Sequence, residues 1–434
     1  MSTGRTVADK LAALLAPQFG DRLPVRIQAW DGSEAGPAGA PVLRVTSRRA
    51  LRRLLWQPDE LGLAQAYITG EIDVPGGADE LAAGFRAVWQ QARDSARDSG
   101  AGSNRLGTRQ KLAAALLAAR LGAIGRRPAA PASQARLTGG LHSRDRDRAA
   151  IAHHYDLSNE FYSLVLDDSM AYSCGYYADS SVTLAQAQRA KLDLICRKLG
   201  LRPGMRLLDV GCGWGSLSLH AAEHYGVRVL GVTLSAQQRD FVGKRIAERD
   251  LADRVEVRIQ DYRELREQPF DAVSSIEMGE HVGEDNYPTY AGALFGHLRP
   301  GGRLVLQQMS RRADAAPGGG PFIEHYIAPD MHMRPLSDTL GFLHRAGFEI
   351  RDVQALREHY VRTVADWSAT FEEHYRDAVA MVGEEVARVW RLYLVGGGLS
   401  FAEGRMGVEQ VLAVRPTASG ESGMPLTPDW LPAG

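Results

Sequence analysis

From about residue 185 onward, short apolar runs alternate with longer stretches that have helical periodicity. This alternation is typical of a parallel β-sheet whose strands are joined by crossover helices. The runs that predict strands lie at residues 206–210, 227–232, 255–257, 270–275 and 302–307. A short unit around Ile350 and a last strand at residues 411–414 are expected to complete the sheet. The pattern therefore predicts a doubly wound α/β domain.

Residues 5–90 follow a different pattern, in which helical periodicity is mixed with strand-like runs at residues 25–27 and 42–45. The segment 31–41 is rich in Gly and Pro and is interpreted as a turn between these runs. We expect a small α+β unit here.

The segment that joins the two patterns is basic. Between Ser103 and Ser143 there is no acidic residue, and leucines at 112, 116, 117 and 121 fall near helical spacing. The basic residues are Arg105, Arg109, Lys111, Arg120, Arg126, Arg127 and Arg136. We interpret the segment as a cationic amphipathic helix followed by a Pro/Ala linker. It either attaches to an anionic lipid surface, at about 1 kcal/mol per basic residue, or is a solvated linker helix packed on its own protein.

Composition narrows the class of protein. The 51 Lys and Arg nearly balance the 52 Asp and Glu, so the net charge of −1 does not favour nucleic acid as a partner. Three cysteines without a CxxC pair argue against a disulfide framework and against a metal site. We find neither a signal-peptide pattern nor about 20 consecutive apolar residues, and therefore expect a cytoplasmic, peripherally membrane-associated protein.

The candidate chemistry begins directly after the first predicted strand of the α/β domain. Gly211, Gly213 and Gly215 stand at every second position, where glycine permits a tight turn and close approach of a ligand. Dinucleotide-binding proteins share this spacing, and a purely structural turn would also explain it. Asp209 at the strand end and the Arg-Pro-Gly-Gly segment 299–302 narrow the choice. Together these features resemble the class I S-adenosylmethionine-dependent methyltransferases, whose Rossmann-like fold packs the glycine loop against the methionine part of the cofactor.

Further motifs resemble the cyclopropane fatty acid synthase family, which includes mycolic acid cyclopropane synthases and fatty acid methyltransferases. They are IAHHYDLSN at 151–159, MAYSC at 170–174, GVTLSAQQ at 231–238, QDYR at 260–263 and EHVG at 280–283. The resemblance covers about residues 150–415, and residues 60–71 weakly resemble the accessory domain of longer bacterial members. It implies an accessory, lipid-presenting domain at 1–100, the basic helix and linker at 101–145, and a methyltransferase domain with an acyl-chain tunnel at 146–434.

The same resemblance implies a set of residues that contact S-adenosylmethionine. Carried over by position, they are Tyr155, Tyr172, Ser173, Gly211, Gly213, Thr233, Gln238, Asp261 and Tyr262. Thr233 and Gln238 suit the ribose hydroxyls, while Tyr262 suits the adenine ring and Asp261 its amino group. A dehydrogenase is disfavoured because Thr233 ends the second strand without a nearby acidic residue.

The resemblance also implies an active centre formed by Cys174, Glu280, Gln307, Met309 and Tyr360. In the cyclopropane synthases the corresponding cluster holds a bicarbonate ion that takes a proton from the newly added methyl group. Gln307 stands where those enzymes generally carry histidine, and Met309 replaces a smaller branched residue. His281 is interpreted as a supporting or helix-capping residue rather than as the general base.

These residues predict methyl transfer to the cis double bond of an unsaturated phospholipid acyl chain, such as oleoyl, at a membrane surface. Because glutamine cannot relay a proton as histidine can, we expect a methylene-branched product. In the alternative, Gln307 merely hydrogen-bonds Glu280 or Tyr360, and the enzyme is a cyclopropane-fatty-acyl-phospholipid synthase. A catalytically inert membrane-binding protein and a methyltransferase for small molecules or proteins are further alternatives. A homodimer and a separate reductase that acts on the product are additional hypotheses.

Overall fold

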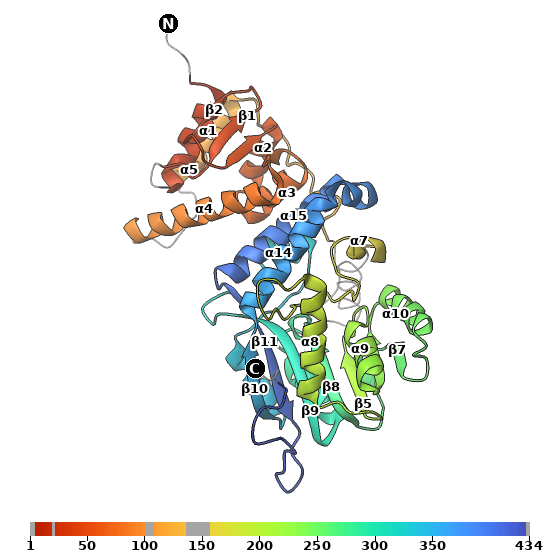
Figure 1. The fold of residues 1–434 in the computed structure, drawn as a ribbon. Helices are drawn as coiled ribbons and strands as arrows, with labels where there is room; N and C mark the ends of the chain where they lie inside the picture. The colour runs from red at the N-terminus through yellow and green to blue at the C-terminus, as the bar shows by residue number, and fades with distance from the viewer. Residues whose placement is uncertain (1–4, 20–21, 100–107, 136–156, 431–434) are drawn as a thin grey trace. The chain divides into compact units, whose positions relative to one another are not determined.

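The computed structural model describes residues 5–19, 22–99, 108–135 and 157–430 of the chain (Figure 1). Tyr155, one of the expected cofactor contacts, lies outside the described residues.

The chain forms two compact units, each made from segments that are distant in the sequence. Unit 1 comprises Met1–Gln134 and Phe371–Gly396, and unit 2 comprises Ala135–Thr370 and Gly397–Gly434. The functional division at residues 1–100, 101–145 and 146–434 stays a prediction.

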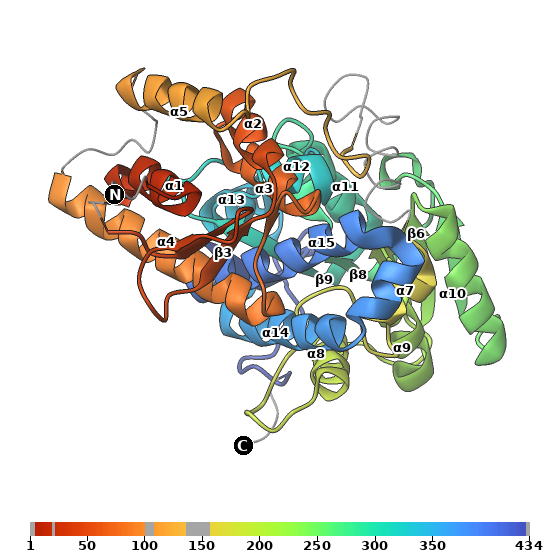
Figure 2. The ribbon, with the colours of Figure 1, turned by 90° about the horizontal axis from the view of Figure 1, so that it is seen from above.

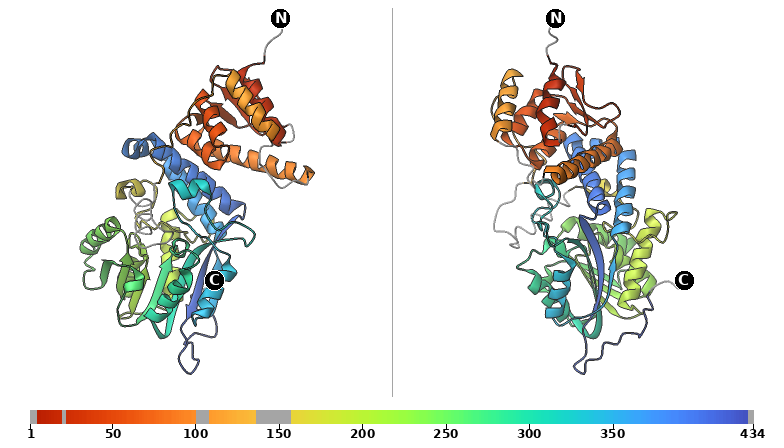
Figure 3. Two further views of the ribbon diagram at one scale, coloured as in Figure 1. Left: turned by 180° about the vertical axis from the view of Figure 1, so that it is seen from behind. Right: turned by 90° about the vertical axis from the view of Figure 1, so that its left-hand side faces the viewer.

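In the described part of the chain, unit 2 contains a seven-stranded sheet in the order β10-β11-β9-β8-β5-β6-β7 (Figure 3). Its strands are β5 (Arg206–Val210), β6 (Arg228–Thr233), β7 (Val255–Ile259), β8 (Phe270–Ile276), β9 (Leu298–Arg311), β10 (Glu349–Ala355) and β11 (Met406–Val414). The neighbours from β7 to β9 are parallel, whereas β11 pairs antiparallel with both β9 and β10. Every strand that the apolar runs predict is present, and the predicted doubly wound sheet is confirmed.

Helices cover both faces of this sheet. These helices are α8 (Leu184–Leu199), α9 (Ser216–Tyr225), α10 (Ala236–Glu248), α11 (Tyr287–His297) and α13 (Leu336–Arg345). Unit 2 also contains the short helices α7 (Asn159–Ser163) and α12 (Pro321–Tyr326). The long helices α14 (Arg357–Glu373) and α15 (Tyr375–Ala402) contribute residues to both units.

Alternation along the strands explains the two faces. Successive strand residues point to opposite sides, so Leu207 packs in one core with α8, α9 and α10, while Leu208 packs in a second core with α11 and α13. The strands are therefore apolar on both sides, as in a sheet covered by helices. This arrangement fixes where the carboxyl ends of β5, β6 and β8 lie, and those ends carry the site.

Unit 1 is a small α+β fold, as predicted, with a four-stranded sheet of the order β2-β1-β3-β4 in its described residues. Its strands are β1 (Arg26–Ala29), β2 (Glu34–Ala35), β3 (Val42–Val45) and β4 (Ile72–Asp73). Its helices include α1 (Val7–Leu15), α2 (Arg48–Trp56), α3 (Glu60–Ile68), α4 (Gly77–Ser99) and α5 (Thr108–Arg120) (Figure 2). Apolar residues of α1, β1, α2 and α3 form its core.

A buried ion pair joins α2 to the segment between α3 and β4 in unit 1. The Arg53 guanidinium is 2% exposed and donates to both carboxylate oxygens of Glu71 at 2.8 and 2.9 Å. Two parallel hydrogen bonds to an ionised partner are stronger than neutral ones. The pair satisfies charges that would otherwise be costly to bury.

Removal of one member of this pair is expected to destabilise unit 1. Glu71→Gln leaves the Arg53 charge without its counter-ion, and breaking such a buried pair typically costs about 3–5 kcal/mol. Glu34→Gln is the matched control, because Glu34 pairs with Arg26 at an exposed site and the loss there is expected to stay below about 1 kcal/mol. Urea unfolding of both variants measures the difference. Equal destabilisation would contradict this account of Arg53.

Candidate active site

A cavity lies at the carboxyl ends of β5, β6 and β8 and gathers residues from five sequence motifs. The expected cofactor contacts that line it are Tyr172, Ser173, Gly211, Gly213, Thr233, Gln238, Asp261 and Tyr262. All of them are described residues, so each expected contact other than Tyr155 lies in one cavity. In open α/β sheets, ligands bind in this position.

The glycine loop leads from β5 into α9, and its three glycines have different tasks. A Cβ at Gly211 would lie 2.8 Å from Cγ of Met278, and one at Gly215 would lie 2.8 Å from Cγ1 of Val242, so both positions require close packing. Gly213 has a φ of 53°, and a Cβ there would meet nothing within 4 Å. Gly213 therefore leaves space on the cavity side, as a ligand cradle requires.

The ends of β6 and β7 present neutral and acidic hydrogen-bonding groups. The Thr233 hydroxyl donates to Oε1 of Gln238 at 2.8 Å, so the two side chains expected to bind a ribose are in contact. The Asp261 carboxylate forms an ion pair with Arg263 at 2.6 Å. The ring of Tyr262 is mostly buried and lies edge-on to Tyr290, with centroids 5.5 Å apart.

A buried ammonium group also lines the cavity. Lys191 of α8 is 1% exposed, and its Nζ donates to Oγ of Ser173 at 2.8 Å. Gln188, one turn earlier, donates to the Ser173 carbonyl at 2.8 Å. Burial lowers the pKa of Lys191, and the nearby Glu277 carboxylate opposes this shift most strongly. α8 thus fixes Ser173 and places a positive charge close to Glu277.

Glu277 is the centre of the site, and the sequence analysis did not identify it. It follows β8 directly, its side chain lines the cavity, and its Oε1 accepts from Nε2 of Gln307 at 2.6 Å. Oε1 also accepts from the Cys174 backbone N–H at 2.9 Å, and Oε2 accepts from the Tyr360 hydroxyl at 2.6 Å. Three of the expected active-centre residues therefore converge on one carboxylate. Desolvation raises the pKa of Glu277, while these hydrogen bonds act in the opposite direction.

The backbone of Glu277 adopts an uncommon conformation. Its φ is 50°, in the left-handed region that glycine adopts much more readily than glutamate. Non-glycine residues in such conformations are concentrated at functional sites, where the surrounding structure holds them in place. The sequence signal was available, because Glu277 and Glu280 stand three residues apart directly after a predicted buried strand.

Gln307 is oriented by a partner on the neighbouring strand. Gln410 of β11 donates to Oε1 of Gln307 at 2.9 Å, which directs the Gln307 amide N–H group toward Glu277. In the expected alternative, Gln307 donates to Glu280 or Tyr360. The structure shows instead that its amide donates to Glu277. Gln307 and Gln410 are both fully buried.

Cys174 contributes its backbone rather than its thiol. Burial raises the pKa of the Cys174 thiol well above its ordinary value, and Glu277 raises it further. The side chain is fully buried, so a nucleophilic thiolate is disfavoured here.

Glu280 lies apart from the three donors that surround Glu277. Its Oε1 accepts from the Met309 backbone N–H at 2.7 Å, and the side chain is completely buried. Burial raises the pKa of Glu280 to about 8, and the neighbouring Glu277 charge raises it as well. His281 lines the cavity at the end of the short 3-10 helix Gly279–His281. At neutral pH Glu280 is therefore protonated and lies next to Glu277.

Aromatic rings form a connected group around Tyr360. Tyr360 stacks on Phe401 with centroids 4.3 Å apart and contacts Trp367 edge-on at 6.0 Å. Trp367 in turn lies 5.3 Å from Tyr172, which contacts Trp214 at 6.4 Å. Sequence analysis identified Tyr172 and Tyr360 but not the other rings, because their contacts join segments far apart in the chain.

The pKa of Glu280 predicts a pH dependence of stability. The folded protein retains this proton up to about pH 8, whereas the unfolded chain loses it near the ordinary value of 4.5. Because the folded state then binds more protons, the contribution of Glu280 to the free energy of unfolding falls as pH rises from about 5 to about 8. Glu280→Gln mimics the neutral carboxyl, so its stability relative to the wild type is expected to improve across this window. Urea unfolding at several pH values measures this difference, and a constant difference would contradict the assignment.

The comparisons with known proteins agree with this geometry. The family model described as mycolic acid cyclopropane synthetase matches residues 142–411. A probable fatty acid methyltransferase of Mycobacterium tuberculosis is 37% identical over 446 residues, covering 100% of both chains. A probable fatty acid methyltransferase of Pseudomonas putida is 42% identical and covers 66% of this chain and 74% of its own length. The cyclopropane-fatty-acyl-phospholipid synthase of Escherichia coli is 36% identical, covering 58% of this chain and 64% of that protein.

Solved structures share the fold of about three fifths of this chain. The cyclopropane synthase MmaA2 of Mycobacterium tuberculosis aligns with a TM-score of 0.59 at 32% identity, covering 63% of this chain and 99% of that one. The mycolic acid cyclopropane synthase CmaA1, solved in complex with SAH and CTAB, aligns with a TM-score of 0.58 at 33% identity, covering 61% and 97%. These structures confirm the predicted class I methyltransferase fold. The chain therefore belongs to the mycolic acid cyclopropane synthetase family.

Proposed function

We propose that this protein transfers a methyl group from S-adenosylmethionine to the cis double bond of an unsaturated phospholipid acyl chain and forms a methylene-branched chain. The observation that carries the proposal is the Glu277 carboxylate, held by Gln307, Tyr360 and the Cys174 backbone. The names of the relatives of this chain support lipid acyl chains as the substrate class. A separate reductase would convert the branch to a methyl group.

The cavity fits the proposed methyl donor. Gly213 leaves space beside the glycine loop, the contacting pair Thr233 and Gln238 suits ribose hydroxyls, and the ring of Tyr262 suits adenine. S-adenosylmethionine supplies an electrophilic methyl group when bound. Trp214 and Tyr172 place aromatic faces near this cavity, and such faces favour a sulfonium cation.

The chemistry of the acyl chain explains the aromatic group and the carboxylate. A new C–C bond to one alkene carbon leaves a positive charge on the other, and the faces of Tyr172, Trp367 and Tyr360 can stabilise this cation. The buried rings also exclude water, which would otherwise add to the cation. A hydride shift moves the charge to the methyl-bearing carbon. Loss of a proton from the methyl group to Glu277 then gives the exocyclic double bond.

We infer that Glu277 takes the place that the family resemblance gives to bicarbonate. Two expected bicarbonate ligands, the Tyr360 hydroxyl and the side chain at position 307, already donate to this carboxylate, and so does the Cys174 backbone. These three donors stabilise the charged form and oppose the rise in the pKa of Glu277 that desolvation causes. Glu277 is also anchored to the backbone, unlike a free ion. A base held in a fixed position gives the cation time for the hydride shift.

The same site also suits a cyclopropane-forming reaction, in which the proton leaves the added methyl group before any hydride shift. The 36% identity to a cyclopropane-fatty-acyl-phospholipid synthase supports this second candidate function. The two reactions differ in whether a hydride shift precedes the loss of the proton, and therefore in whether a ring bond or an exocyclic double bond forms.

The cofactor assignment predicts the effect of a substitution at Gly213. Gly213→Asp is expected to abolish S-adenosylmethionine binding, because the carboxyl group fills the open space beside the loop. Gly204→Asp is the matched control, since Gly204 also has a positive φ, of 85°, with nothing within 4 Å, but lies in an exposed turn. Isothermal titration calorimetry measures both affinities. Unchanged affinity in Gly213→Asp would exclude this cavity as the cofactor site.

The proposed product predicts a specific lipid change. Expression in a host with oleoyl phospholipids is expected to yield fatty acids that are one CH₂ heavier and carry a methylene branch, as gas chromatography with mass spectrometry can show. In Gln307→His a cyclopropane fraction is expected to rise, because histidine can relay a proton. A wild-type enzyme that forms only cyclopropane would contradict the branched product and leave the second function.

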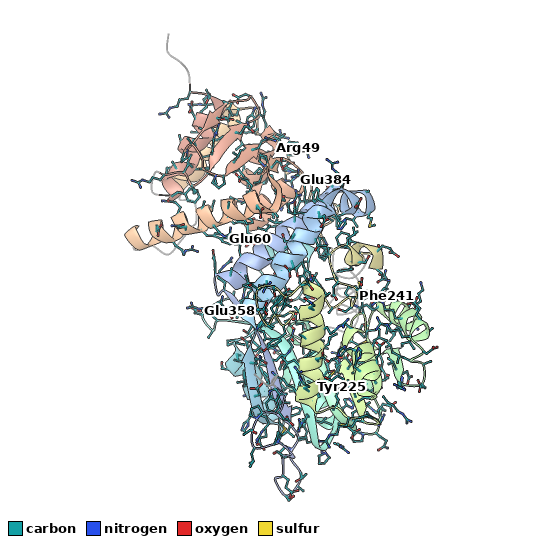
Figure 4. All side chains as sticks on the ribbon, viewed as in Figure 1. Arg49, Glu60, Tyr225, Phe241, Glu358 and Glu384 are labelled. Atoms are coloured by element: carbon teal, nitrogen blue, oxygen red, sulfur yellow. The ribbon has the colours of Figure 1, made fainter. Side chains whose placement is uncertain are left out.

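The role of Glu277 as base predicts a separation of catalysis from binding. Glu277→Gln is expected to lower kcat by roughly 10²–10⁴-fold, the usual contribution of a general base, while S-adenosylmethionine affinity stays close to that of the wild type. Glu358→Gln is the control, an exposed glutamate on the helix that carries Tyr360 (Figure 4). Wild-type kcat in Glu277→Gln would show that another group takes the proton.

A further inference from the structure

We propose that one face of unit 1 docks on the surface of an anionic phospholipid bilayer. This face, here called the α2–α5 face, is formed by Arg48, Arg52, Trp56, Leu112, Leu116, Ile124, Arg126 and Arg127. The proposal rests on the proposed function, in which the substrate is a phospholipid acyl chain. It assigns the membrane contact to a folded surface built from two helices and the segment after α5.

Large apolar side chains are exposed on this face. Trp56 is 57% exposed, Leu112 62%, Leu116 53% and Ile124 62%. Leu112 and Leu116 stand one turn apart on α5. The indole N–H of Trp56 donates to the carbonyl of Gly125 at 3.1 Å, which holds Trp56 next to Ile124. Exposed apolar side chains that gather on one surface are a mark of an interaction site.

α2 and α5 both pack on the core of unit 1. α2 and α5 are in contact with each other (Figure 2). Ala50 of α2 belongs to that core and Leu117 of α5 packs against it. Trp56 of α2 and Leu116 of α5 do not belong to this core and are exposed.

Arginines lie on the same elements as the exposed apolar residues. Arg48, Arg52 and Trp56 are spaced at i, i+4 and i+8 along α2, and the Arg52 Nε donates to the carbonyl of Ala123 at 3.0 Å. Arg126 and Arg127 are exposed, and Arg127 donates to Gln57 rather than to a carboxylate. Within the described ranges, none of these four arginines forms an ion pair. Their positive charge is therefore available to an anionic partner.

The combination favours a bilayer over other anionic partners. An indole ring is stable at the membrane–water interface, where its apolar body and polar N–H group face different environments. Leucine and isoleucine gain from contact with acyl chains, whereas a nucleic acid backbone offers them nothing comparable. Each basic residue near an anionic membrane surface strengthens binding about fivefold. Exposed apolar residues together with arginines thus match the layered chemistry of a phospholipid surface.

Vesicle sedimentation of the full-length protein tests the proposal. The vesicles are phosphatidylcholine alone, or phosphatidylcholine with about one third phosphatidylglycerol, at low and at high salt. We expect binding to the anionic vesicles that weakens with salt. Arg126→Gln with Arg127→Gln is expected to weaken binding about 25-fold, the product of two fivefold losses. Trp56→Ser with Ile124→Ser should also weaken it. Leu426→Ser with Arg228→Gln is the control, because both residues are exposed in unit 2, and wild-type binding is expected.

The outcomes separate the docking face from the catalytic function. Calorimetric affinity for S-adenosylmethionine is expected to be the same in all variants, which shows that unit 2 is folded. Wild-type vesicle binding by both face variants would overturn the proposal. Loss of binding to a short DNA duplex in the arginine variant, with vesicle binding unchanged, would also overturn it. Face-dependent vesicle binding by an enzyme that methylates no phospholipid would support the docking face and reject the proposed function.

Discussion

The active site depends on how the Glu277 carboxylate obtains its hydrogen-bond donors. A carboxylate shielded from bulk water is stable only when donors replace the lost hydration. Glu277 accepts from Gln307 on β9, from Tyr360 on α14 and from the Cys174 backbone. These donors come from elements whose positions the sheet and its covering helices fix. The left-handed φ of Glu277 persists because this surrounding network holds it.

Three buried or partly buried ionisable groups lie together here: Glu277 itself, Lys191 and Glu280. The Lys191 ammonium on α8 lies close enough to oppose the rise in the pKa of Glu277. Glu280 keeps its proton to about pH 8, because burial and the charge of Glu277 both disfavour a second carboxylate. Glu280 is therefore neutral at neutral pH, and the Lys191 ammonium group lies near Glu277. In the proposed reaction, this distribution of charge would suit a proton acceptor beside aromatic rings that stabilise a cation.

The two units have different proposed tasks, which are catalysis in unit 2 and contact with a lipid surface in unit 1. Unit 2 contains the cavity, the carboxylate and the aromatic rings, and its strands are apolar on both sides because helices cover them. Unit 1 carries exposed apolar residues beside arginines without ion pairs in its described part. In the described residues no helix is long and apolar enough to cross a bilayer.

The sequence by itself determined the order of strands and helices in the α/β domain and the position of its glycine loop. Apolar periodicity and glycine spacing are local properties, and the short motifs around Thr233 and Asp261 stay on adjacent parallel strands once the sheet forms. The central role of Glu277 was decided only by the tertiary structure. Its partners are up to 103 positions away in the chain, at Cys174, and no local pattern shows which of two nearby glutamates receives their hydrogen bonds. The orientation of Gln307 likewise depends on Gln410, which reaches it only because β11 returns antiparallel beside β9. Long-range pairing of strands decides such contacts, and a linear sequence carries no direct signal for them.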